Sequence, residues 1–527
     1  MGQAEIVIAG VLVAVVVLNA LALRLSVPYP IVLVIGGALL GFIPGMPTIK
    51  LNPNVVLVVF LPPLVYGAAF FANLGDLRSN LRATTLVSVG LVLVTMVTVA
   101  LAAHALIPGL SWGAAFALGA VVSPTDPLAG ASIMRRLECP RRLVSAVEGE
   151  GLFNDATALV SYKVAVAAVV GGSFSLLSAG WQFLAGAAGG VAIGLAVGWI
   201  VAEVRKRTSD VQTSVTISLL SGYAAFIPAN AIGASGVLAA VTTGIYMGIR
   251  GPSIIPPRVR LEGFFVWEML DFIINASLFV LVGLQLRGVV DGLGGESAGT
   301  LAAYAVGVSA VVIGTRLAWF FTLPYLVRVL DRRPAQRARR VGARARLVIA
   351  WAGTRGAVSL AAALALPLAT NSGAPFPDRD LIIFLTFAVI FATLVIQGLS
   401  LPTLIRRLGV TRDGSEDSEE IRARLIATKA ALRQLDDLAA EEWTRDDTID
   451  RLRRAYDYRK RRFAARAGKI EDDGYEDRSL AYQQVIQIVL AAQRETLVRA
   501  RNSGEISNET MNRIIQELDL EESRLEI

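Results

Sequence analysis

Ionisable residues lie inside an otherwise apolar stretch that covers residues 142 to 171. The segment 148–155 reads Glu-Gly-Glu-Gly-Leu-Phe-Asn-Asp. On a helix, Glu148 and Asp155 share one face, whereas Glu150 and Asn154 share another. Asp155 has no basic residue within one turn, and burial disfavours the charged form of a carboxyl group. We therefore expect Asp155 to exchange a proton for a cation near neutral pH, unless a salt bridge or helix N-termini hold it permanently charged.

Two arginines supply counter-charges in other apolar stretches. Arg316 lies within residues 299 to 327, and Arg355 lies within residues 345 to 369. An unpaired arginine at mid-membrane is costly, so either side chain is a candidate partner for Glu150. We expect a fixed Arg–Glu bridge that supports the site without itself moving ions.

Prolines and glycines interrupt two of the apolar stretches. The interruptions read Ser-Pro-Thr-Asp-Pro at 123–127 and Ala-Gly-Thr-Arg-Gly at 352–356. Proline has no N–H, so Pro127 leaves the carbonyl of Ser123 without its helical partner. Such a carbonyl can coordinate a cation, although neighbouring helices or water can also satisfy it. The pattern predicts two broken helices at membrane depth, which is typical of transporters.

Composition shows which elements must carry these residues. Of 527 residues, 54% are apolar and 18% are charged, and the mean hydropathy is +0.57. Charged residues number 46 among the first 410 positions and 47 among the last 117. This contrast predicts an all-helical membrane domain at 1–410 and a water-facing helical tail at 411–527. One cysteine and one histidine exclude a disulfide framework and a Cys/His metal cluster, and no cofactor motif is present, so we expect no cofactor and no enzyme.

Thirteen apolar segments are long enough to be spans or parts of spans. They cover residues 4–23, 30–45, 54–72, 85–107, 112–133, 142–171, 180–204, 211–228, 233–250, 263–286, 299–327, 345–369 and 380–405. The loops after odd-numbered segments, with their flanks, hold 21 Lys and Arg, whereas the opposite loops hold Lys50, Arg287 and Arg379. The positive-inside rule then places the N-terminus outside and the tail in the cytoplasm.

Two further patterns concern packing and the tail. Gly186, Gly190, Gly194 and Gly198 form a smooth stripe, for which we favour contact within the chain over a dimer seam.

In the tail, helical spacing of leucines and the glycines at 474 and 504 predict three or four helices, with the basic run 451–466 on one of them.

Five motifs of the sequence together resemble the monovalent cation/proton antiporter family, in its bacterial sodium/proton exchanger branch. The motifs are Phe-Leu-Pro-Pro-Leu at 60–64, the break at 123–127, the Asn154-Asp155 pair, the stretch 275–283, and Thr-Arg-Gly at 354–356 followed by Val-Ser-Leu. They occur in the family's order, each on a predicted span, and the resemblance covers nearly all of residues 1–410.

The resemblance implies an inverted-repeat antiporter fold with two crossed broken helices, a homodimer, and a role in pH homeostasis at the bacterial inner membrane. The excess of 29 basic over 17 acidic residues in 1–410, with an acidic excess after it, indicates membrane topology rather than a nucleic-acid partner. The resemblance also implies that Asp155 binds the transported Na⁺ and proton, that Thr125 is a cation ligand through its side chain and its main chain, and that Asn154 is the structural partner of Asp155. It pairs Glu150 with Arg316. Asp126 and Gly151 complete the expected ion-binding set, and Arg355 completes the supporting charges.

Two positions depart from the pattern and remove oxygens from the expected site. Gly151 stands where some members have serine. Some members also have a glutamate one turn after the Leu-Pro-Pro stretch, where this chain reads Val65-Tyr66-Gly67. A hard cation prefers a full oxygen shell, so water must substitute, or the preference moves from Na⁺ toward K⁺. The resemblance, in which the Asn154-Asp155 pair is similar to that of the electroneutral exchangers, implies electroneutral Na⁺/H⁺ exchange, and we expect Na⁺, Li⁺ or K⁺ as cargo. K⁺/H⁺ exchange and a cation channel or sensor remain the alternatives.

Overall fold

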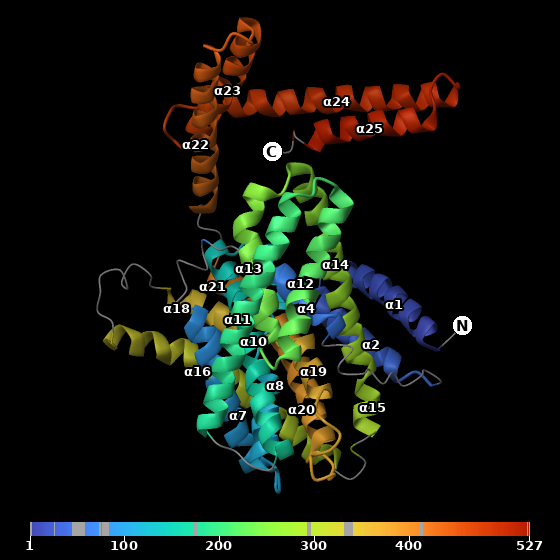
Figure 1. Ribbon diagram of the computed structural model, residues 1–527, viewed down its shortest axis with the longest axis vertical. Coiled ribbons are helices and arrows are strands. Elements are labelled where there is room, and N and C mark those ends of the chain that lie inside the picture. Colours follow the sequence, from blue (N-terminus) through green and yellow to red (C-terminus); the bar gives the residue numbers. More distant parts are fainter. Residues whose placement is uncertain are drawn as a thin grey trace. The chain divides into compact units, whose positions relative to one another are not determined.

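The computed structural model describes residues 3–25, 27–44, 58–72, 75, 84–171, 176–291, 293, 297–330, 341–410, 415–523 and 525. Within those residues every regular element is a helix, which confirms the all-helical prediction (Figure 1). The chain divides into two compact units, Met1–Arg412 and Asp413–Ile527. Lys50, residues 54–57 of the third predicted segment, the basic residues of 331–340 and the junction 411–414 lie outside the described residues.

The helices of the first unit follow the predicted apolar segments in order. They are α1 (Gln3–Leu25), α2 (Tyr29–Gly41), α4 (Leu61–Phe70), η1 (Leu86–Leu91), α7 (Val92–Leu106), α8 (Trp112–Val122), α9 (Pro127–Arg136), α10 (Arg141–Gly171), α11 (Leu176–Lys206), α12 (Val211–Ala231), α13 (Gly236–Ile254), α14 (Pro257–Leu284), α15 (Leu286–Asp291), α16 (Ala298–Leu330), α18 (Ala343–Trp351), α19 (Ala357–Leu364), α20 (Arg379–Ala392), η2 (Thr393–Gln397) and α21 (Gly398–Leu408). The segments η1 and η2 are π-helical turns within longer helices.

Six helical stretches of the described residues are long and apolar enough to cross a membrane. They are Leu86–Leu106, Arg141–Gly171, Gly180–Lys206, Pro257–Gly288, Ala298–Val327 and Arg379–Leu408. The fifth and twelfth predicted segments are instead each divided into two short helices, α8 with α9 and α18 with α19. The two predicted helix breaks are therefore confirmed.

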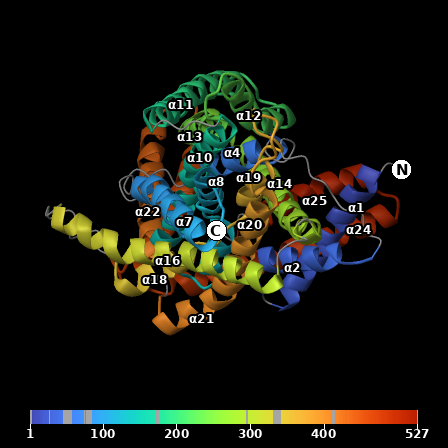
Figure 2. The same cartoon turned by 90° about the horizontal axis from the view of Figure 1, so that it is seen from below.

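Glycines bring α11 and α13 into close contact. A Cβ atom on Gly190 would lie 2.5 Å from the carbonyl oxygen of Ser235, and one on Gly194 would lie 2.5 Å from that of Ala239. The hydroxyl of Thr243 also donates to the Gly194 carbonyl at 2.9 Å. The glycine stripe thus packs within the chain, as predicted. Figure 2 shows α11, α12 and α13 together along one edge of the bundle, with α16 and α18 along another.

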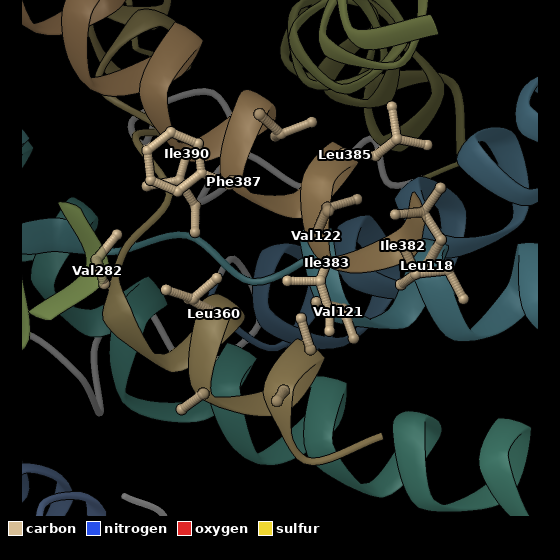
Figure 3. Close-up of a cluster of buried hydrophobic side chains, with 14 of the residues drawn as sticks. Leu118, Val121, Val122, Val282, Leu360, Ile382, Ile383, Leu385, Phe387 and Ile390 are labelled. Carbon is tan, nitrogen blue, oxygen red and sulfur yellow. The ribbon is translucent and has the colours of Figure 1, made fainter. Parts of the chain in front are cut away.

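A buried apolar cluster holds the broken helices in place. Leu118, Val121 and Val122 of α8 pack with Leu360 of α19 and with Ile382 of α20 (Figure 3). Apolar surface gains little from leaving lipid, so helices at this depth are held mainly by close packing and hydrogen bonds. Val122 is the last residue of α8, so this packing fixes the point at which the first break begins.

The second unit consists of four helices, in agreement with the predicted three or four. They are α22 (Ser415–Leu438), α23 (Asp446–Arg466), α24 (Tyr475–Asn502) and α25 (Asn508–Ser523). Helix α22 packs against α23, and α24 packs against α25 (Figure 1). Gly474 precedes α24 with φ of 72°, and Gly504 follows it with φ of 82°. Both angles lie in the left-handed region that glycine adopts without steric cost.

A charged clasp joins α23 to the start of α24. Arg462 donates to both carboxylate oxygens of Glu476 at 3.2 and 3.1 Å, and Arg466 donates to the same carboxylate. Hydrogen bonds from Arg462 lower the pKa of Glu476 from its ordinary value. A lowered pKa means that the clasp stabilises the fold above the unfolded-state pKa and that this stabilisation is lost as pH falls through the folded-state pKa.

Candidate functional site

The two helix breaks meet and are hydrogen-bonded to each other. The N–H of Asp126 donates to the carbonyl of Thr354 at 2.7 Å, and the hydroxyl of Thr354 donates to the carbonyl of Asp126 at 2.9 Å. Each break therefore hydrogen-bonds to backbone groups that the helices of the other break leave without a helical partner. Thr354 and Asp126 are 228 positions apart in the chain, so the junction joins two distant segments.

Close packing at the junction requires glycine at position 356. A Cβ atom there would lie 1.8 Å from Oδ2 of Asp126, a distance that no side chain tolerates. Oδ1 of Asp126 accepts the N–H of Leu128 at 2.9 Å and so caps the start of α9. The Asp126 side chain thus serves as a helix cap and lies against the backbone of the other break.

A buried polar network links the first break to α10. The Thr125 hydroxyl donates to Oε1 of Glu150 at 2.7 Å. The Asn154 amide nitrogen donates to the carbonyl and to the hydroxyl oxygen of Thr125, both at 2.8 Å. All three residues are buried. Consequently Thr125, which has Pro124 before it and lacks helical hydrogen bonds, is held by side chains of one neighbouring helix.

Arg316 of α16 is the arginine that pairs with Glu150. Its guanidinium contacts both carboxylate oxygens, with Nη2 to Oε2 at 2.8 Å, and it is only 1% exposed. It also donates to the carbonyls of Ala350 at 3.0 Å and Ile349 at 3.2 Å, near the end of α18. A bidentate pair with further acceptors satisfies a buried charge well. The structure therefore joins α10, α16, α18 and the first break through one ion pair.

Arg355 is buried as well, but it bonds to backbone rather than to Glu150. Its Nε donates to the carbonyl of Val122 at 3.2 Å, and its Nη1 donates to the carbonyl of Gly353. Its own N–H donates to the hydroxyl of Thr393 at 3.1 Å. Arg355 thus covers free carbonyls of both breaks.

Asp155 differs from its neighbours in having no such partner. Among the described residues, no donor bonds to its carboxyl group, which lies within electrostatic range of Asp126. The side-chain oxygen of Asn154, one position earlier, is buried and likewise has no partner in the described part of the chain. The side chains of Asp155 and Asn154, which lie next to the breaks, therefore have oxygen atoms that could bind a ligand.

Position 151 lies against the first break. A Cβ atom on Gly151 would lie 2.6 Å from Cγ of Pro127. A Cβ atom on Gly67 would lie 2.9 Å from the ring of Trp267. The missing oxygens at these two positions thus coincide with close helix contacts, so no side chain could be added at either without movement.

Two residues at the site, Ser88 and Thr393, carried no signal in the sequence. Ser88 lies in η1 and donates to the carbonyl of Glu150 at 3.0 Å, while Thr393 lies in η2 beside Arg355. Both occupy π-helical turns, which are frequent at functional sites but have no simple sequence pattern. Asp271 of α14, by contrast, is an acid within the predicted apolar segment 263–286, where a charge is costly and marks a candidate pathway or packing residue. It interacts electrostatically with Asp126 and accepts a hydrogen bond from Asn275 at 3.1 Å.

Comparison with known proteins identifies the family of the chain. Residues 10–407 match the family described as sodium/hydrogen exchanger, transmembrane. An uncharacterized Na⁺/H⁺ exchanger of Mycobacterium tuberculosis is 38% identical over 526 residues, which cover 99% of this chain and 96% of the relative. A sodium, potassium, lithium and rubidium/H⁺ antiporter of Bacillus subtilis is 31% identical, over 76% of this chain and 61% of its own length.

A solved structure shares the fold. The sodium proton antiporter MjNhaP1 of Methanocaldococcus jannaschii superposes with a TM-score of 0.59 at 18% identity, over 76% of this chain and all of that one. The chain is an integral, multi-pass membrane protein, and it belongs to the sodium/hydrogen exchanger family.

Proposed function

We propose that the chain is a secondary active antiporter that exchanges a monovalent cation, Na⁺ first, for a proton at Asp155. The observation that carries the proposal is the contrast between two acids that lie five residues apart on α10. Glu150 is neutralised by Arg316, whereas Asp155 has no bonded partner among the described residues. A carboxyl group without a fixed counter-charge can take either a proton or a cation, so the two ligands compete for one site.

Oxygen atoms around Asp155 suit a small hard cation. The candidates are the carboxylate of Asp155, the side-chain oxygen of Asn154, the carbonyl of Thr125 and Oδ2 of Asp126. Within the described part of the chain, neither the Asn154 oxygen nor Oδ2 of Asp126 accepts a hydrogen bond. The Thr125 carbonyl accepts one hydrogen bond and has a second lone pair. Gly151 supplies no oxygen, so water completes the shell. Sodium is the transported substrate in this scheme, not a resident cofactor.

The supporting charges keep the exchange electrically simple. Glu150 and Arg316 cancel each other, and Arg355 is bound to backbone carbonyls. If one carboxylate binds either one proton or one monovalent cation, the occupied site carries the same charge with either ligand, on both sides of the membrane. We therefore propose a one-for-one, electroneutral exchange driven by the proton gradient, with the breaks and α10 alternating their exposure.

Topology and assembly belong to the same proposal. Thirteen spans with the basic loops inside give an outside N-terminus and a cytoplasmic helical tail at 411–527. We place the protein in the bacterial inner membrane as a homodimer that contributes to pH homeostasis.

Potassium is the second candidate cargo. The lack of side-chain oxygens at Gly67 and Gly151 weakens the case for strict sodium selectivity. One experiment separates the candidates. The purified protein is reconstituted into proteoliposomes with an internal pH dye, and NaCl, LiCl or KCl is added in turn. Proton movement with Na⁺ that saturates and is unchanged when the membrane potential is clamped supports the proposal. A response to K⁺ alone reassigns the cargo, and no response to any cation refutes exchange.

A further inference from the structure

Helix α24 in the tail has an apolar face that its neighbour does not cover. Toward α25 it buries Leu490, and Arg494 pairs with Asp519 and Glu522. The opposite face is exposed and holds Ala481, Val485, Ile488 and Ala492, with Val485 57% and Ile488 70% accessible. Spacings of four, three and four residues align these side chains in one seam along the helix.

The composition around this seam is unusual for a water-facing helix. Residues 479–493 contain no charged residue, although 47 of the last 117 residues are charged. The outer face of a solvated helix normally carries charged and polar residues. A long uncharged segment with branched apolar side chains at its centre indicates a surface that another apolar surface covers.

The residue pattern of the seam is symmetric about its centre. Its ends are Ala481 and Ala492, its middle is Val485 and Ile488, and both pairs are symmetric about the point between residues 486 and 487. If a second copy of α24 runs antiparallel about a two-fold axis through this point, alanine faces alanine and valine faces isoleucine. Small residues at the ends allow close approach, and one patch serves both partners, as an isologous interface requires.

Charges at the two ends of the helix favour the same arrangement. Antiparallel pairing places Arg478 opposite Glu495 of the second copy, and both side chains are exposed. It also places the acidic segment 471–473 near Arg499 and Arg501 of the second copy. Parallel pairing would instead bring like charges together. We propose that α24 is a homodimerisation helix whose seam binds a second copy of this chain in antiparallel orientation.

Cysteine cross-linking of the full-length chain tests this arrangement. The buried native thiol is removed by Cys139→Ser, and Ala481→Cys and Ala492→Cys variants are co-expressed in one membrane and oxidised. The proposal predicts a covalent dimer from the mixture and none from either variant alone. In the antiparallel pair two copies of residue 481 are eleven residues apart along the axis, or about 16 Å, which is beyond the reach of a disulfide.

Placing a charged residue in the seam provides a second test of the same proposal. Ile488→Glu, added to both cysteine variants, is expected to reduce the covalent dimer to background, whereas the matched Gln487→Glu change on the adjacent exposed position leaves it. Retained exchange activity shows that the Ile488→Glu chain is folded. Absence of dimer in the co-expressed pair overturns the proposal and leaves the seam to another part of this chain or to lipid. Dimers from each single variant overturn the antiparallel orientation, and equal loss with both glutamates overturns the role of the seam.

Discussion

Replacing Glu150 by glutamine isolates the charge of the buried ion pair. The substitution keeps the shape and an oxygen that can accept the Thr125 hydroxyl, but it leaves the 1% exposed guanidinium of Arg316 without a counter-charge. Breaking a buried pair by neutralising one partner costs about 3–5 kcal/mol. The backbone carbonyls of Ala350 and Ile349 still accept from Arg316, so we expect a loss at the lower end of that range, about 3 kcal/mol.

The same helix offers a matched control. Glu148 pairs with Arg135 at the surface, where their side chains are 38% and 66% exposed. Exposed pairs contribute about 0–1 kcal/mol, so Glu148→Gln should leave stability nearly unchanged. Thermal unfolding of both variants in detergent, followed by the fraction that remains monodisperse, measures the difference. Equal melting temperatures for the two variants would refute the structural role given to the Glu150–Arg316 pair.

Three further outcomes follow from the geometry. Gly356→Ala should abolish exchange because a Cβ atom clashes with Asp126, whereas Gly314→Ala, which has open space, should be tolerated; proteoliposome flux compares them. Gly151→Ser should lower the exchange rate, since its side chain displaces the first break; a gain in sodium affinity at full rate contradicts this. Hydrogen-exchange protection at the start of α24, expressed relative to the intrinsic exchange rate at each pH, should fall as pH drops below about 4.5, and Glu476→Gln should remove that dependence.

The helices and their breaks could be predicted from local sequence. Apolar length identified the segments, and proline at 124 and 127 marked the first break because a missing N–H acts on the residue's own helix. The adjacent Asn154 and Asp155 were singled out for a similar reason, since charge within an apolar run is costly wherever the helix packs.

Long-range pairing could not be derived in this way. Arg316 and Arg355 were equivalent candidates for Glu150 on residue type alone, and only the packing of α16 against α18 brings Arg316 to it across 166 positions. Thr125 was expected as a cation ligand through its hydroxyl as well as its carbonyl. In the structure that hydroxyl already donates to Glu150 and accepts from Asn154.

The proton and cation competition at Asp155 is the central claim, and Asp155→Asn tests it most directly. Asparagine has nearly the same shape but cannot ionise, so the site can neither release a proton nor neutralise a cation. Dye-reported proton movement in proteoliposomes should fall to the level of protein-free vesicles with Na⁺, Li⁺ and K⁺, while the variant unfolds at the wild-type temperature or above it. Exchange at the wild-type rate in a folded Asp155→Asn protein would contradict the account.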